Sequence, residues 1–406
     1  MLEKSSDVVV LGAGPAGSAT ALFLARAGYD VVLLDRAAFP RDKPCGEYLT
    51  PGAVKMLRDE LGVLPEILML GARRLDREAV VPHAACSFSG PTEALACPRV
   101  ITDRVLLDQA RAAGVRVTES FAARNILKEG GRICGVQGTG AQGDEQTTYR
   151  ARVVVGADGT HSLLAREMGV VRPIPRLQRI ALVTHYAAAE SVADSSVTMH
   201  LPGDSSDACC GVGAPCGPGM TQNVNIVVPI TEAKEMAGRR QEYFEERLRR
   251  SFPQVWEQVS SQIQVGPLHS IGCFGHHTKR AADDSAVLVG DAATFIHPFT
   301  GEGVFFALRG AQLAAETINL GFQKGDLSRR SLQNYDAARR AELLPRYRLC
   351  DAVQHIVHSP ALLAWAAARL QRSASLTELL LQTIGDRARP ADLFTLPNLR
   401  LALSTL

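Results

Sequence analysis

The amino-acid sequence predicts an α/β fold with three parts: a three-layer domain on a parallel sheet, an inserted antiparallel β-sheet domain, and a helical C-terminal region. Three observations support this prediction. The first forty residues predict a strand, a helix and a second strand. From Ile180 to about Cys273, stretches such as Asn223–Pro229 alternate apolar and polar residues, which is typical of antiparallel strands. After Leu320 the pattern is largely helical, with a break at Pro360.

The first predicted unit has clear boundaries. Val8–Leu11 is short, β-branched and followed by glycine, as expected of a buried parallel strand. Positions 16–27 predict a helix that ends at Gly28. Val31–Leu34 predicts the second strand, and Asp35 follows it directly. This order is that of a βαβ unit.

Gly12, Gly14 and Gly17 occupy the turn between the first strand and the helix. Glycines at this spacing allow a tight turn, close approach of a pyrophosphate to backbone N–H groups, and close helix–strand packing. The N-terminus of the helix supplies partial positive charge to phosphates. Asp35 stands where an acid accepts hydrogen bonds from an adenosine ribose. The unit therefore predicts a Rossmann-like dinucleotide site, and an ordinary glycine-rich turn is the alternative.

A second G-x-G-x-x-G match lies at Gly138–Gly143. A predicted strand, Arg132–Val136, precedes it, but another predicted strand, Thr147–Val155, follows with no helix between them. This arrangement predicts a glycine-rich hairpin turn. The chain is therefore expected to hold one dinucleotide fold and no second one for a nicotinamide.

Two acid–glycine pairs complete a pattern with the first turn: Asp158-Gly159 and Gly290-Asp291, each after a predicted buried strand. With these three motifs in order, roughly residues 7–320 resemble the FAD-dependent monooxygenase and geranylgeranyl reductase superfamily, which has the p-hydroxybenzoate hydroxylase fold. The resemblance implies bound FAD, with Asp35 and Arg36 at the adenosine. It also places Arg104 on the phosphate side, Asp291 near the pyrophosphate and ribityl, and Asp158 in the turn that shapes the pocket.

A long helix predicted from Glu302 to about Leu320 follows the Asp291 loop. Its N-terminal dipole is expected to face the flavin and to stabilise negative charge on the reduced ring. Gly301 and Gly303 would let the backbone approach the ring closely. The full set of residues expected to contact FAD is Gly12, Gly14, Pro15, Ala16, Gly17, Asp35, Arg36, Gly46, Arg104, Asp158, Asp291, Gly301, Glu302 and Gly303.

Three residues are candidates for the chemistry. Cys45 lies on a basic, glycine-flanked loop, which favours a place at the flavin edge over a small buried hydrophobe. Glu47 is either a general acid or a loop carboxylate. His297 is expected near the flavin face, where it is either catalytic or structural. No metal site is expected, because the cysteines and histidines around positions 209–216 and 273–277 lack paired C-x-x-C spacing.

Composition limits the partners. The net charge is +2, and 46% of the residues are hydrophobic, as in a soluble globular protein that has no reason to bind nucleic acid. No run of eighteen apolar residues predicts a membrane span, although the Ala361–Ala368 stretch is a candidate for peripheral membrane contact. Nine cysteines with no secretory signal fit reduced thiols and a cytoplasmic location. The protein is expected to be a monomer or a homodimer.

The fold class expected is thus a three-layer FAD-binding Rossmann-like domain, an inserted antiparallel β-sheet substrate domain and a helical C-terminal region. The sheet would cover the flavin, so that a substrate binds between them. The expected division is residues 1–70, 99–179 and 276–340 for the FAD-binding domain, 71–98 and 180–275 for the substrate-binding sheet domain, and 341–406 for the C-terminal region.

Two short stretches bear on the reaction. Lys43–Glu47 and Pro298–Gly303 are similar to the geranylgeranyl reductase branch, but the Tyr-x-Trp-x-Phe-Pro motif of isoprenoid reductases is missing, and Asp207–Pro215 holds no aromatic residue in its place. The leading hypothesis is an NAD(P)H-dependent monooxygenase. It would act on a hydrophobic or aromatic small molecule through a flavin C4a-hydroperoxide, with NAD(P)H docking transiently as the reductant. The alternatives are an FAD-dependent reductase of C=C bonds and a maturation flavoprotein that modifies a side chain of a partner protein.

Overall fold

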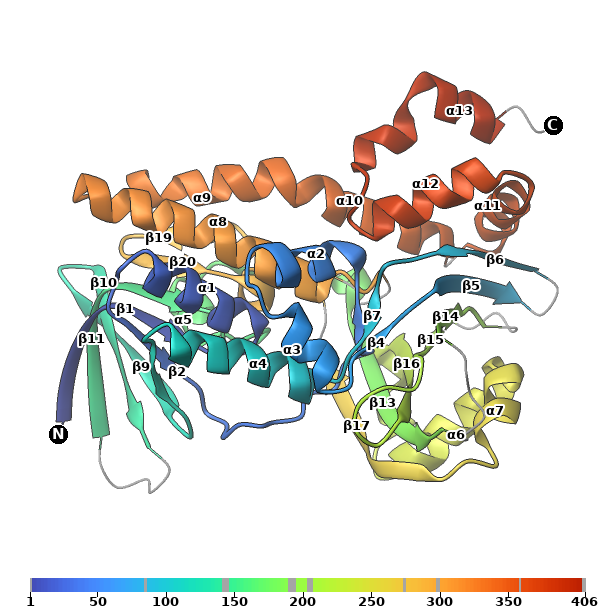
Figure 1. Ribbon diagram of the computed structural model, residues 1–406, viewed down its shortest axis with the longest axis horizontal. Coiled ribbons are helices and arrows are strands. Elements are labelled where there is room, and N and C mark those ends of the chain that lie inside the picture. The colour runs from blue at the N-terminus through green and yellow to red at the C-terminus, as the bar shows by residue number, and fades with distance from the viewer. Residues whose placement is uncertain are drawn as a thin grey trace.

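The computed structural model describes residues 2–83, 86–140, 146–188, 195–202, 207–272, 275–296, 300–357 and 359–403. It has a mainly parallel sheet flanked by helices, an antiparallel sheet beside it, and C-terminal helices that extend over the antiparallel sheet (Figure 1). The fold class expected from the sequence is confirmed. No helix in the described part of the chain is long and apolar enough to cross a membrane.

The main sheet has eight strands in the order β19-β20-β11-β1-β2-β8, with β10 and β9 added beside β11. Its core pairs are parallel, and the last four residues of β1, Val8–Leu11, are buried among them. The strand begins at Leu2, six residues before the predicted start, because its exposed first half pairs with β11 from Leu2↔Thr147 onward. The strands are β1 (Leu2–Leu11), β2 (Val31–Leu34), β8 (Arg116–Thr118), β9 (Ala122–Glu129), β10 (Arg132–Thr139), β11 (Gln146–Gly156), β19 (Ala282–Asp283) and β20 (Ala286–Leu288).

Helix α1 (Pro15–Arg26) packs against α4 (Arg99–Ala112) and against the long α8 (Gly303–Lys324), beside the parallel sheet (Figure 1). The helix and strand predicted on either side of Gly28 are confirmed. Thr102 followed by Asp103 and Arg104 predicts a helix that Thr102 caps. This prediction is wrong, because α4 begins three residues earlier, after Pro98, and Thr102 is fully buried within it. The remaining helices of this part are α2 (Pro51–Asp59), α3 (Leu64–Met69) and α5 (Leu163–Glu167).

The second glycine-rich motif lies in a hairpin, as predicted. Strands β10 and β11 pair antiparallel through Gly138↔Thr147. The space around Gly140 is open, because no atom would lie within 4 Å of a Cβ there. The rest of this motif falls outside the described residues. Of the two glycine-rich motifs, the one at Gly12 therefore leads into a helix, and the one at Gly138 lies between two antiparallel strands.

The antiparallel sheet has seven strands in the order β17-β13-β16-β15-β14-β5-β6. One face packs against α6 (Arg240–Ser251) and α7 (Pro253–Val259), in a core that includes Leu182, Ile226 and Phe244. The strands are β5 (Arg77–His83), β6 (Cys86–Pro91), β13 (Arg179–Ala187), β14 (Ser196–His200), β15 (Cys209–Val212), β16 (Thr221–Pro229) and β17 (Gln264–Gly272). Two small sheets join the parts: β3 (Tyr48–Leu49), β7 (Leu95–Ala96) and β4 (Arg73–Arg74), and β12 (Val171–Pro173), β18 (His276–Thr278) and β21 (Thr294–Phe295).

The C-terminal region caps this arrangement from above in the view of Figure 1. Helices α11 and α12 pack against β6, and Val357 and Leu363 contact the second face of the antiparallel sheet. The helices are α9 (Arg329–Glu342), α10 (Leu344–Val357), α11 (Pro360–Arg372), α12 (Ala374–Ile384) and α13 (Leu396–Leu403), with Pro360 at the first position of α11. The predicted break at Pro360 is confirmed.

The turn after α12 docks tightly on the start of α2. Gly52 donates a backbone hydrogen bond to the carbonyl of Gly385 (3.0 Å). Thr50, the N-cap residue of α2, donates its hydroxyl to Asp386 Oδ2 (2.8 Å). A Cβ at Gly52 would lie only 2.3 Å from Cβ of Asp386. Position 52 therefore has to be glycine for the C-terminal region to sit here.

We expect Gly52→Ala to destabilise the docked C-terminal region. In an ordinary helix this change stabilises by about 1 kcal/mol, but the overlap with Asp386 should reverse the sign and cost about 1–3 kcal/mol. Limited proteolysis after residue 341 and thermal unfolding measure the effect. Gly140→Ala is the matched control, since nothing lies within 4 Å of its Cβ. Equal stability of the two variants would contradict the docking.

Candidate functional site: a flavin cradle and the loop beside it

The glycine turn has the geometry of a phosphate cradle. Gly12 has φ +94°, and a Cβ there would lie 2.5 Å from the carbonyl oxygen of Ala157. A Cβ at Gly17 would lie 1.7 Å from the carbonyl oxygen of Gly12, so only glycine lets α1 approach the turn. Gly14 differs, because it lies beside two arginines: a Cβ would lie 3.5 Å from Nη2 of Arg41 and 3.9 Å from Nη2 of Arg99. The N-terminus of α1 and two cations therefore lie together, as in a site for phosphate groups.

Arg99 and Arg41 are held by a carboxylate that the sequence analysis did not select. Arg99 donates two hydrogen bonds of 2.8 Å to Asp103, and both side chains are buried. Arg41 lies 3.3 Å from the same carboxylate. The signal that could have found this pair is the i, i+4 spacing of Arg99 and Asp103 at the start of α4. Arg104, expected on the phosphate side, pairs instead with Asp108, and its side chain is 43% exposed.

The two acids near this turn are placed differently. Asp35 is buried at the end of β2 and accepts hydrogen bonds from the backbone of Ala13 (2.6 Å) and Ala37 (2.8 Å), which fixes its carboxylate beside the turn. Asp158 accepts one from Leu163 N (2.7 Å), while its other oxygen is buried with no partner among the described residues. Burial raises the pKa of Asp158, and the hydrogen bonds oppose this shift. Arg36 is exposed.

Pro15 and Ala16 open α1, and the third motif packs on them. A Cβ at Gly290, which has φ +57°, would lie 2.8 Å from Cβ of Ala16. Asp291, in the short 3₁₀ turn Gly290–Ala292, lies 3.7 Å from Lys43 Nζ. The three dispersed motifs of the sequence therefore meet at one place.

Residues 301–303 lie where α8 begins, and their environments differ. A Cβ at Gly301 would lie 2.4 Å from the ring of Tyr48, so this glycine makes room for a tyrosine. No atom of the described residues would lie within 4 Å of a Cβ at Gly303. Glu302 is buried, and Oε2 accepts from the Cys350 thiol (2.8 Å). Burial raises the pKa of Glu302, and its side chain faces the C-terminal region.

A polar contact joins the Cys45–Glu47 loop to the antiparallel sheet. Glu47 is buried, and its Oε1 lies 2.9 Å from Nε2 of His185 on β13. Asn223 of β16 donates to the carbonyl of Cys45 (2.9 Å). A Cβ at Gly46 would meet Asn225 at 3.5 Å, so the loop lies directly on the sheet. Cys45 itself is half-buried. His185 is a candidate functional residue that sequence reasoning missed.

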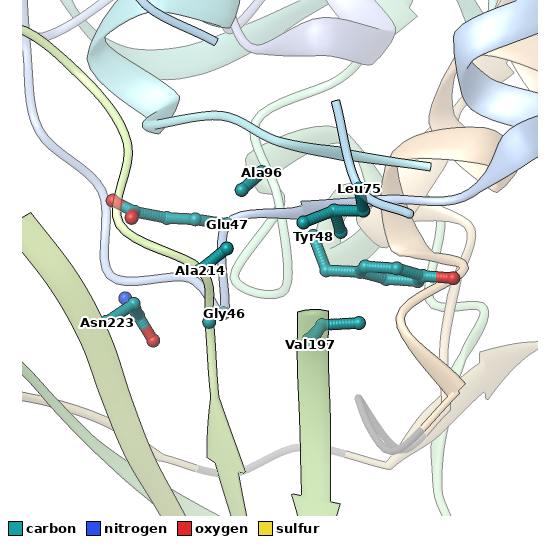
Figure 2. Close-up of a pocket in the computed structure, with 9 residues that line it drawn as sticks. Gly46, Glu47, Tyr48, Leu75, Ala96, Val197, Ala214 and Asn223 are labelled. Atoms are coloured by element: carbon teal, nitrogen blue, oxygen red, sulfur yellow. The ribbon is translucent and has the colours of Figure 1, made fainter. Parts of the chain in front are cut away.

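A small hollow borders this loop. It holds about 200 Å³ of space not filled by atoms, and its lining includes Glu47, Tyr48 and Asn223. Figure 2 shows the Glu47 carboxylate and the Tyr48 ring on opposite sides of the chain. Tyr48 donates to Glu78 (2.6 Å), whose pKa burial raises to about 7. This space is too narrow to admit even a water molecule, so it is a gap between packed side chains and not itself a ligand pocket.

The third catalytic candidate of the sequence, His297, lies outside the described residues. Cys45 and Glu47 are adjacent to the sheet. Arg36, expected at the adenosine, is exposed, and Arg104, expected on the phosphate side, is half-exposed and pairs with Asp108. Their roles in catalysis and binding stay predictions. The unpartnered Asp158 oxygen and the two arginines beside Gly14 fit a bound dinucleotide.

Comparison with known proteins identifies the family. The FAD binding domain family model matches residues 5–343. The chain belongs to this family. The comparisons place it in the geranylgeranyl reductase and flavin halogenase–monooxygenase superfamily, as an FAD-dependent oxidoreductase.

Relatives with curated names include two reductases. A digeranylgeranylglycerophospholipid reductase of Methanopyrus kandleri is 28% identical over 86% of this chain and 93% of its own length. A menaquinone reductase of Mycolicibacterium smegmatis is 31% identical over 79% of this chain and 78% of its own. Among solved structures, a flavin-dependent brominase matches with a TM-score of 0.84 and 20% identity, covering 99% of this chain and 98% of that one. The last likeness shows the fold alone.

We expect Gly14→Val to abolish FAD binding, because its branched side chain would fill the space in front of Arg41 and Arg99. Gly140→Val is the matched control, since that position is open and far along the hairpin. Flavin absorbance after refolding with excess FAD measures the difference. Equal loss in both variants would contradict the assignment of the cradle.

Arg99→Lys should weaken FAD binding roughly tenfold, about 1.4 kcal/mol, because lysine keeps the charge but loses the two-pronged grip on Asp103. Arg104→Lys, in the same helix, should change it less, because Arg104 is half-exposed and pairs with Asp108. Titration of the apoprotein with FAD compares them. A larger effect at Arg104 would support the role that the sequence gave to that residue.

Proposed function

We propose that this oxidoreductase is an FAD-dependent reductase of carbon–carbon double bonds, acting on a substrate with an apolar, isoprenoid-type chain. Two curated relatives support the reaction class, since both are named as reductases of lipids that carry isoprenoid chains. The similarity of the Lys43–Glu47 loop to the geranylgeranyl reductase branch points the same way.

The observation that carries the proposal is the second face of the antiparallel sheet. At its apolar end lie Ala181, Val183, Cys209 and Val227, packed with Leu363 and other aliphatic residues of the C-terminal helices. At its polar end, residues two positions further along the same strands are His185 and Asn225, beside the Cys45–Glu47 loop. One face of the sheet thus changes from apolar to polar along its strands. It matches a molecule whose apolar chain lies at the apolar end and whose reacting segment lies at the polar end, near the flavin.

The missing aromatic motif now has a structural counterpart. A Cβ at Gly211 of β15 would lie 2.9 Å from Nδ2 of Asn225, and a Cβ at Gly213 would lie 3.5 Å from Asn223. Amide side chains therefore occupy the space over these two glycines. We infer that the substrate segment bound here carries a polar group near the double bond, in contrast to a wholly apolar chain.

In this proposal bound FAD supplies hydride transfer, and the chain's own residues do the rest. The Gly12–Gly17 turn with Arg41 and Arg99 would hold the pyrophosphate, and the start of α8 would lie beside the ring. The antiparallel sheet and the C-terminal helices would exclude water from the reacting segment. NAD(P)H would dock transiently as the reductant of the flavin.

The other two hypotheses have weaker support. A monooxygenase has the same fold as a reductase of this superfamily, so only its oxygen dependence separates them. A maturation factor would need a long exposed apolar surface on the inserted sheet for its partner protein. Both faces of that sheet are covered. The large apolar residues exposed on or next to its described strands are Met220, next to β16, Ile263, next to β17, and Val265, which do not form a long surface.

We expect the dithionite-reduced holoprotein, kept without oxygen, to convert menaquinone or a digeranylgeranylglycerophospholipid to a product two hydrogens heavier. The reaction mixture with menaquinone is exposed to air before mass spectrometry, because a quinol formed at the ring then returns to the quinone while a reduced side chain keeps its added hydrogens. Protein with Gly14→Val, lacking FAD, is the control. A product that gains one oxygen atom, and only in air, would overturn the proposal in favour of a monooxygenase.

A further inference from the structure

His185 stands on the face of the antiparallel sheet that meets the Cys45–Glu47 loop. Its neighbour Tyr186 belongs to the core under α6 and α7, and side chains alternate along β13, so His185 faces the other way. Nε2 of His185 is 2.9 Å from Glu47 Oε1 and 3.3 Å from Nδ2 of Asn223. Its Nδ1 forms no hydrogen bond with any described residue. One ring nitrogen is therefore anchored and the other is available.

The backbone of Glu47 is arranged to make this contact. Its φ of +57° lies in the left-handed region, which is uncommon for a residue with a side chain. The backbone N–H of Cys97 fixes it by donating to the Glu47 carbonyl (2.8 Å). This conformation sends Glu47 and Tyr48 to opposite sides of the chain (Figure 2). Strain of this kind concentrates at functional sites.

We propose that His185 is the acid that protonates the substrate's double bond and that Glu47 is its positioning residue. The inference deepens the proposed function and rests on it. The arrangement is that of a carboxylate that holds an imidazolium through one nitrogen, so that the proton on the other nitrogen is directed at a reacting group.

The atoms and electrons of the step balance. Reduction of a C=C bond adds a hydride to one carbon and a proton to the other. The hydride, with both electrons, comes from reduced FAD. The Nδ1–H bond of His185 breaks as the new C–H bond forms, and neutral His185 keeps its Nε2–H on Glu47. Water then returns a proton to Nδ1.

The surroundings keep the imidazolium available. Burial lowers the pKa of His185, but the hydrogen bond and charge of Glu47, with the charge of Asp42, outweigh burial and raise it. Two thiols also face Glu47: Cys216, whose Sγ lies 3.9 Å from Oε2, and Cys97. Burial and the charge of Glu47 raise the pKa of both thiols, so both stay neutral. Asn223 adds no charge. The protonated form of His185 therefore persists to higher pH than that of a free histidine.

The first experiment compares His185→Gln with His200→Gln in the holoprotein. His200 pairs with Cys210, which belongs to the core under α6 and α7, so it occupies the opposite face of the sheet. FAD in the protein is first reduced with dithionite. Its reoxidation is then followed without oxygen, after addition of whichever of menaquinone and digeranylgeranylglycerophospholipid the wild-type protein reduces. We expect His185→Gln to slow it roughly 10²–10⁴-fold, with FAD content and reduction by dithionite unchanged, and His200→Gln to leave it near wild type.

The second experiment tests the positioning role through pH. The rate should fall as pH rises through the pKa of His185, because the acid form is lost. Glu47→Gln keeps the shape but removes the charge that raises this pKa, so the alkaline limb should move to lower pH. Proton NMR of the His185 ring, identified by its absence in His185→Gln, should show the same shift in protein that is not turning over. A merely structural Glu47 would shift the ring titration but leave the alkaline limb of the rate where it is in the wild type.

The outcomes are separable. A wild-type protein that reduces neither probe overturns the proposed function and this inference with it. A wild type that reduces a probe while His185→Gln does so at the same rate overturns this inference alone. If His185→Gln loses FAD, the Glu47→Gln rate profile decides. A ring titration that shifts while the alkaline limb of the rate does not is then the contrary result.

Discussion

The rest of the structure depends on how closely α1 approaches the turn after β1. A Cβ at position 17 would lie 1.7 Å from the carbonyl oxygen of Gly12. The helix can therefore start where it does only because residue 17 is glycine. The same turn touches Ala157, at the end of β11, and Ala16 touches Gly290. Motifs separated by more than a hundred residues in the chain are thus in van der Waals contact, and the pocket for the dinucleotide is formed by that contact.

Much of the fold could be predicted because its signals are local. The burial pattern of Val8–Leu11, the helix stop at Gly28 and the amphipathic α6 each depend on neighbours in sequence. The hairpin at Gly138 was separable from a nucleotide turn because a strand follows it. The start of α4 could not be read in the same way, since the Thr102 hydroxyl contacts Cys97 instead of capping a helix end.

The candidate site was harder to predict, because its partners are distant in sequence. His185 and Glu47 are 138 residues apart, and nothing near His185 distinguishes it from a histidine in any half-buried strand. Arg41 and Arg99 matter through their common approach to Gly14, which only the folded chain creates. Glu302 was expected at the cofactor by its place before a long helix, whereas its carboxylate turns to Cys350 and the C-terminal region. Position along the chain indicated the neighbourhood but not the direction of the side chain.

The docking of Gly385 and Asp386 on α2 has a consequence for how the protein is made. Thr50 and Asp386 are 336 residues apart, so an early helix of the parallel-sheet part receives this contact from a segment that is synthesised much later. Synthesis of β1, the glycine turn and α1 is complete long before Asp386 is added. Strand β11, which pairs with β1 from Leu2 to Leu11, is synthesised between these two points. A nascent chain can therefore complete its parallel sheet and its pyrophosphate cradle before the C-terminal helices close over the substrate face. The order of translation therefore leaves an interval in which the glycine turn has formed and the C-terminal helices do not yet cover the antiparallel sheet.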